Sequence, residues 1–210
     1  MVTKCLFLLR GWLSKQPAIA KGAEFLLTAL VFSLAYTQEA IFNSPEDADG
    51  NQNTKYFLGL ARAGHGFLER DWLASTIDAL PAFTALVEWS YRLFQSEIIF
   101  FIGYGLILGL YVFSLVGIVN YLYPLRTSRT RYLAYLGLFI FIHTVNLRIG
   151  RLDTGWDLHA GVAKQYLLGP VFQPCNFGVL LLTSIWAFLY GRWGLAVVGS
   201  AIAPQFTQLI

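Results

Sequence analysis

The chain has 210 residues, of which 56% are hydrophobic and 13% are charged, and its formal net charge is +3. Soluble domains carry about 25% charged residues, so this composition disfavours a soluble globular enzyme and predicts a polytopic membrane protein. Cys5 and Cys175 are too far apart to form a CxxC pair, and the chain has only three histidines. The sequence therefore gives no support for a zinc site or a disulfide framework. The small net charge also gives no reason to expect nucleic acid as a partner.

Residues 1–22 are predicted to form a cytoplasmic or interfacial N-terminal segment. This segment contains Lys4, Arg10, Lys15 and Lys21 and no acidic residue, which favours a helix lying on the inner leaflet over residues 5–20. The remaining residues, 23–210, are predicted to form a single transmembrane domain with an outer loop at 43–96.

Four apolar segments, the first two of bilayer length, predict an all-α fold with four transmembrane helices and a short fifth. A fifth apolar stretch is shorter, and Pro204 is expected to stop it. The four segments are residues 23–42, 98–123, 132–147 and 177–190, and the fifth is 193–203.

The distribution of basic residues predicts the orientation in the membrane. The turn at 124–131 holds three arginines and no acid, whereas the loop at 43–96 holds seven acidic and four basic residues. We therefore expect an integral protein of the plasma (inner) membrane, with a cytoplasmic N-terminus and the loops 43–96 and 148–170 outside.

Two amphipathic helices are predicted within the first outer loop. Apolar residues recur at helical spacing over 54–67 and again over 82–94. Thr54 could cap the first helix, and Pro81 suits the first turn of the second. These helices are expected to lie on the membrane face or on the other spans.

Three carboxylates are candidates for catalysis in this loop. Asp47 and Asp49 follow the first span, and Asp71 lies between Arg70 and Trp72. A carboxylate near the bilayer surface could accept a proton from a hydroxyl or hold a divalent cation, and Trp72 could stack on a sugar ring. The alternatives are an acidic solvated turn at 46–49 and an interfacial tryptophan anchor beside a local ion pair.

The second outer loop supplies candidate binding residues. Arg148 and Arg151 follow the third span, and His159 lies further along the loop. Arginine at this depth could hold a lipid-linked phosphate with two parallel hydrogen bonds. The alternative is that both arginines make ordinary contacts with lipid headgroups.

Three stretches carry a resemblance to known proteins. They read NQNTKYFLGLARAGHGFLERDWL at 51–73, DALPAFTALVEWSYRL at 78–93 and GVAKQYLLGPVFQPCNFGVLLL at 161–182. The chain resembles the N-terminal part of an uncharacterised group of bacterial multi-pass proteins, and these in turn resemble the C superfamily of glycosyltransferases, which take sugars from polyprenyl-phosphate donors. The resemblance implies an essential carboxylate in the first outer loop. The chain departs from the pattern of these enzymes at Asn51 and Gln52, because the enzymes place an acidic residue near this position.

Two functions follow from these observations. The first is a glycosyltransferase-like membrane protein acting on a lipid-linked sugar at the outer face, with polyprenyl-phosphate sugar and membrane lipid as partners. The chain would then be the front half of a longer protein or a truncated relative. The second is a non-catalytic transmembrane subunit of a larger membrane complex, with other membrane subunits as partners. No cofactor is predicted apart from the divalent cation that a carboxylate could hold.

Overall fold

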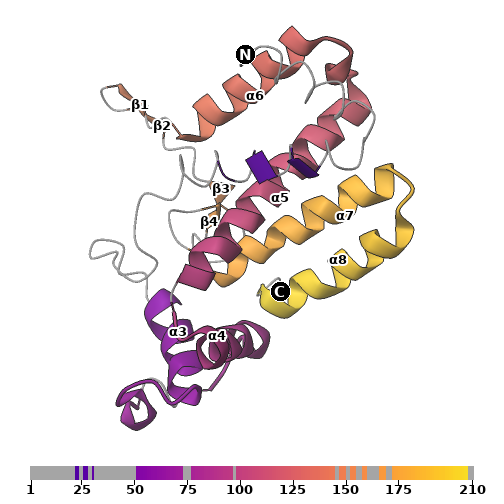
Figure 1. The fold of residues 1–210 in the computed structure, drawn as a ribbon. Helices are drawn as coiled ribbons and strands as arrows, with labels where there is room; N and C mark the ends of the chain where they lie inside the picture. The colour runs from indigo at the N-terminus through magenta and orange to yellow at the C-terminus, as the bar shows by residue number, and fades with distance from the viewer. Residues whose placement is uncertain are drawn as a thin grey trace, which may run out of the picture.

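The computed structural model describes residues 22–23, 26–27, 30, 51–72, 77–96, 98–144, 147–149, 152–154, 158–159, 166–168 and 172–207 (Figure 1). Within these residues the fold is mostly helical, which confirms the coarse prediction. Two short antiparallel hairpins, which the sequence analysis did not predict, lie between the helices. The predicted N-terminal segment, and most of the predicted first span at 23–42, lie outside the described residues.

Both amphipathic helices of the first outer loop are present, as α3 (Asn51–Arg62) and α4 (Pro81–Phe94). Early in both helices, the Tyr56 ring meets the Phe83 ring edge-on at 5.4 Å between centroids. Late in both helices, the Arg62 carbonyl accepts a hydrogen bond from Arg92. The two helices therefore run in the same direction. The helices approach closely at Gly59, where an added Cβ would lie 2.6 Å from the Cβ of Val87. We call α3 and α4 the short helix pair.

The ends of α3 differ from the prediction. The helix includes Asn51, so Thr54 lies inside it rather than at its cap. It stops at Arg62 instead of reaching Phe67, because Gly64 adopts φ 75° and the His65 amide bonds back to the Leu60 carbonyl. This is the usual way in which a glycine ends a helix.

Helix α5 (Ile98–Leu122) has 25 residues and confirms the predicted helix at 98–123. It is about 37 Å long at 1.5 Å per residue, against a bilayer core of about 30 Å. Among the described residues, α5 is the one helix long and apolar enough to cross a membrane. Ser96 helps to start it by accepting a hydrogen bond from the Ile98 amide.

The later helices lie at the predicted positions but are shorter than a typical span of about 20 residues. They are α6 (Arg129–Thr144), after the 3-10 turn η3 (Leu125–Thr127); α7 (Val179–Leu189), after the 3-10 turn η4 (Pro174–Gly178); and α8 (Trp193–Phe206). The count of four transmembrane helices therefore stays a prediction.

Pro204 does not stop α8, contrary to prediction, and lies within its last turn. Thr207 bonds to the Ala203 carbonyl through both its amide and its hydroxyl, at 3.1 and 3.0 Å. Phe206 stacks on Phe177 at 4.2 Å between ring centroids. These contacts fix the last turn, although a proline donates no backbone hydrogen bond there.

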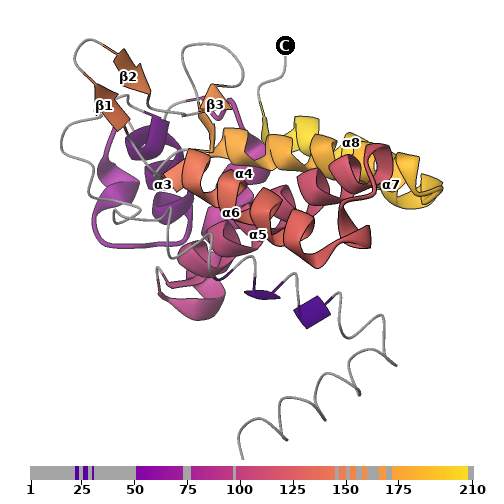
Figure 2. The ribbon, with the colours of Figure 1, turned by 90° about the horizontal axis from the view of Figure 1, so that it is seen from above.

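Helices α5, α7 and α8 lie side by side, and we call them the three-helix layer (Figure 1). Ser114 of α5 and Thr183 of α7 share a buried hydrogen bond of 3.0 Å. Gly117 of α5 faces the Trp186 indole so closely that a methyl group there would overlap it. Helix α6 lies beside α5 (Figure 2), where the Phe139 ring is 5.9 Å from that of Tyr111.

An aromatic core joins the short helix pair to the start of the three-helix layer. Phe172 lies against Phe83 of α4 and against Phe100 and Tyr104 of α5, with centroid distances of 5.8 to 6.4 Å. The Tyr56 hydroxyl donates a 3.1 Å hydrogen bond to the Phe172 carbonyl. Burial raises the pKa of Tyr56 well above its ordinary value, so the hydroxyl stays a donor.

The two hairpins occupy the second predicted outer loop. Strand β1 (Leu147–Ile149) pairs with β2 (Leu152–Thr154), and β3 (Leu158–His159) pairs with β4 (Tyr166–Leu168).

Candidate functional site

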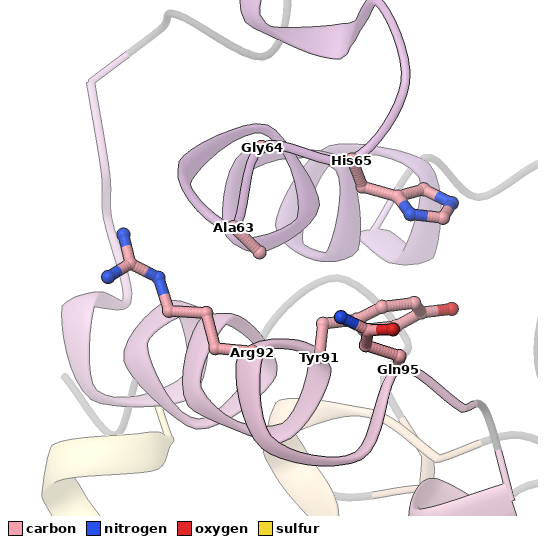
Figure 3. A pocket seen from close by; sticks show the side chains of 6 residues that line it. All are labelled: Ala63, Gly64, His65, Tyr91, Arg92 and Gln95. Atoms are coloured by element: carbon pink, nitrogen blue, oxygen red, sulfur yellow. The ribbon is translucent and has the colours of Figure 1, made fainter.

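An open pocket of about 390 Å³ lies between the C-terminal ends of α3 and α4 (Figure 3). Because the two helices are parallel, their last turns meet at the same end of the pair. The pocket is lined by Ala63, Gly64, His65, Tyr91, Arg92 and Gln95.

The two chain reversals that form the pocket both use left-handed backbone. Gly64 reverses the chain after α3, and Gln95 does so after α4 with φ 47°. The Gln95 amide bonds back to the Tyr91 carbonyl at 2.9 Å. A non-glycine residue in this conformation is uncommon, and here it places the Gln95 side chain at the pocket wall.

Aromatic and polar side chains share the pocket. The His65 ring lies 5.2 Å from the Tyr91 ring, tilted by 55°. Figure 3 shows His65, Tyr91 and Gln95 on one side of the pocket and Arg92 on the other. This combination offers a ring surface together with an amide, an imidazole and a guanidinium, which suits a ligand rich in hydroxyl groups.

Arg92 is held by three neighbours. Its guanidinium lies 2.8 Å from the Glu88 carboxylate, donates to the Arg62 carbonyl at 2.9 Å and lies 5.8 Å from the centre of the Trp89 ring. The positive charge at the C-terminal end of α3 is favourable, because helix carbonyls point outward there. With Glu88 beside it, Arg92 gives the pocket a hydrogen-bonding wall rather than an excess of positive charge.

Asp78, which the sequence analysis passed over, holds the pocket's supporting structure together. One carboxylate oxygen accepts hydrogen bonds from the Leu80 amide and the Thr84 hydroxyl, both at 3.0 Å. The other lies 3.0 Å from the Arg62 guanidinium. An aspartate side chain that accepts the amide two residues further on forms a common turn, so a turn at Asp78 could have been predicted from the sequence.

The structure places Asp71 and Trp72 just after the 3-10 turn η1 (Leu68–Arg70). Asp71 is half-buried, and its amide donates to the Leu68 carbonyl at 3.0 Å. Trp72 is 79% exposed. Neither residue lines the pocket.

Of the remaining predicted site residues, some lie outside the described residues and the others are located by their strand pairing alone. Asp47, Asp49 and Arg151 lie outside the described residues. Arg148 belongs to β1, opposite Asp153 of β2, and His159 belongs to β3, opposite Tyr166 of β4. The backbone pairing thus assigns Arg148 and His159 to two different hairpins.

Among the described residues, no three His, Cys, Asp or Glu side chains are grouped so that they could hold a metal ion. Comparison of the chain with protein-family models, with curated proteins and with solved structures finds no match.

Proposed function

We propose that the chain is a glycosyltransferase-like integral membrane protein that acts on a lipid-linked sugar at the outer membrane face. The observation that carries this proposal is the pocket at the end of the short helix pair. It combines a ring surface with hydrogen-bonding side chains, and its helices pack against the start of a helix long enough to cross a membrane. A sugar attached to a lipid carrier needs both features close together.

In this proposal the pocket holds the sugar ring and a carboxylate activates the acceptor. Asp71 is the first candidate, with Asp47 and Asp49 as alternatives. The carboxylate accepts the proton of the acceptor hydroxyl, whose oxygen bonds to the sugar's anomeric carbon as the bond to the polyprenyl phosphate breaks. Arg148 or Arg151 would hold the departing phosphate, Trp72 and His159 would contact the parts of the substrates that extend beyond the pocket, and a divalent cation could bind the carboxylate.

A specific observation favours the second function, a non-catalytic transmembrane subunit of a larger complex. Two acidic residues of the outer loop have structural partners: Asp78 pairs with Arg62 of α3, and Glu88 pairs with Arg92 of its own helix, whose guanidinium also reaches the Arg62 carbonyl. Charged residues that stabilise the structure of the loop do not require a catalytic role.

A transfer assay separates the two functions. The chain is reconstituted in vesicles with a polyprenyl-phosphate sugar labelled in the sugar, and transfer to a soluble acceptor is measured. We expect Asp71→Asn to fold normally and to lose transfer by on the order of 10²-fold or more, while the control Glu97→Gln keeps it. Unchanged transfer by Asp71→Asn moves the role to Asp47 or Asp49. If the wild-type chain transfers no sugar, the subunit function replaces the enzyme.

The proposal includes the plasma (inner) membrane as the location, with a cytoplasmic N-terminus. It is supported by the arginines of the turn between α5 and α6, since basic residues favour the inner side. A cysteine at Gly50 should react with an impermeant thiol reagent added outside intact cells, and a cysteine at Ser128 should not. The opposite labelling would reverse the topology and exclude an outer-face site.

A further inference from the structure

Helix α4 has a second apolar face, where Leu86 packs partly against the core and two large side chains are exposed. Its buried face carries Phe83, Val87 and Tyr91. Leu86, Trp89 and Leu93 recur at i, i+3 and i+7 and therefore share another face. Trp89 is 58% exposed and Leu93 is 69% exposed. We call these three residues the outer face of α4.

The outer face has the chemistry of a membrane interface. Tryptophan is enriched where a bilayer meets water, and arginine there lays its stem on apolar surface while its charge stays at the headgroups. Arg92 does this beside the outer face: its guanidinium lies 5.8 Å from the centre of the Trp89 ring, and 48% of its side chain is exposed.

Further exposed apolar side chains follow the outer face along the chain, at the end of α4 and on α5. Helix α4 ends at Phe94 and α5 begins at Ile98, and these two side chains are 57% and 65% exposed. Ile98, Ile102 and Leu106 follow at intervals of four residues, so they form one exposed apolar stripe on α5. On a helix that crosses a membrane, such a stripe faces acyl chains.

We propose that the outer face of α4 binds the lipid surface, with Trp89 and Leu93 among the upper acyl chains and Arg92 at the phosphates of the headgroups. The proposal rests on α5 crossing the membrane and does not require transferase activity. Lipid is favoured over a second protein because a connection of only three residues joins α4 to a long apolar helix that carries an exposed apolar stripe of its own. Since Arg92 also lines the pocket, the pocket then opens at the level of the headgroups.

Spin labelling tests this placement in vesicles of phosphatidylcholine and phosphatidylglycerol. In a Cys5→Ser, Cys175→Ala background, a nitroxide is attached at Leu93→Cys and, as the matched control, at Gln95→Cys, which is exposed on the pocket side. Collision with oxygen reports acyl chains, and collision with a neutral nickel chelate reports water. We expect the oxygen-to-nickel ratio to be several-fold higher at position 93 than at position 95.

Equal ratios at the two positions would overturn the proposal, because the outer face would then be in water. Exclusion of both reagents from position 93 would also overturn it, because protein would cover the face: either the predicted span at 23–42 or a second copy of the chain. A label at Trp89→Cys repeats the measurement should the Leu93 variant fail to fold. Sugar transfer is measured separately on the unlabelled protein, so failure of this placement is distinguishable from failure of the proposed function.

Discussion

The short helix pair and the three-helix layer stabilise their polar groups in different ways. In the pair, the polar contacts at the pocket are charged: Arg62 with Asp78, and Arg92 with Glu88. Each ion pair has one well-covered carboxylate and one guanidinium about half exposed. Among the described residues of the layer, most side-chain hydrogen bonds use hydroxyl groups instead, and the one between Ser114 and Thr183 is an example.

This difference is the one expected if the short helix pair lies in water and the three-helix layer lies in a membrane. A guanidinium that remains half exposed keeps much of its hydration, so pairing it costs little at a boundary with water. A hydroxyl can satisfy itself on its own helix, as Ser184 does by donating to the Leu180 carbonyl at 2.8 Å, and therefore suits a region without water. On this hypothesis, the boundary between water and membrane would lie where α4 meets α5.

Loss of the Asp78 carboxylate should have the largest effect on stability. Asp78→Ala removes the acceptor of the Leu80 amide and the Thr84 hydroxyl together with the partner of Arg62. Loss of two hydrogen bonds to a charged acceptor, together with the partner of Arg62, predicts destabilisation by about 3 kcal/mol. Thermal and chemical unfolding in mild detergent, followed by circular dichroism, would measure it.

Glu88→Gln is the matched control for that experiment. It also removes one partner of an ion pair, but Glu88 and Arg92 are four residues apart on one helix face. Such pairs contribute about 0.3–0.5 kcal/mol, so this variant should change the stability by less than about 1 kcal/mol. If both variants had the same small effect, Asp78 would not hold the pair together.

A smaller effect is expected from close packing in the three-helix layer. Gly117→Ala places a methyl group against the Trp186 indole, whereas Gly103→Ala on the same helix meets nothing within 4 Å. Both changes gain the same intrinsic helix preference, so the difference between them isolates the overlap. We expect Gly117→Ala to be less stable than Gly103→Ala by about 1–3 kcal/mol. Equal stabilities would show that α5 and α7 are not in close contact at this point.

Periodicity and apolar length were enough to locate the helices. Residues 98–123 lack any charge, and 82–94 repeat apolar residues at helical spacing, so α5 and α4 lie where predicted. Helix ends were less accurate, because they depend on backbone conformation and on tertiary contacts. Gly64 ends α3 early, and the stacking of Phe206 on Phe177 fixes the last turn of α8 beyond Pro204.

The pocket could not be predicted, because its walls come from two helices and the periodicity of the sequence does not show that these helices are parallel. Charge and spacing drew attention to Asp71 and Trp72, which are neighbours in sequence. His65 and Tyr91 are 26 positions apart, and their ring contact depends on how α3 and α4 align. The hydrogen bonds of Asp78 likewise depend on the path of the chain into α4.

The hydrogen bond from Tyr56 to the Phe172 carbonyl also sets an order of events during synthesis. Its partners are separated by 116 residues, and ribosomes add about 5–20 residues per second. The short helix pair therefore leaves the ribosome on the order of ten seconds before the segment that completes its aromatic core. During that interval Phe83 and Phe100 lack the Phe172 ring that covers them in the finished protein, so the aromatic core closes only after residue 172 has been made.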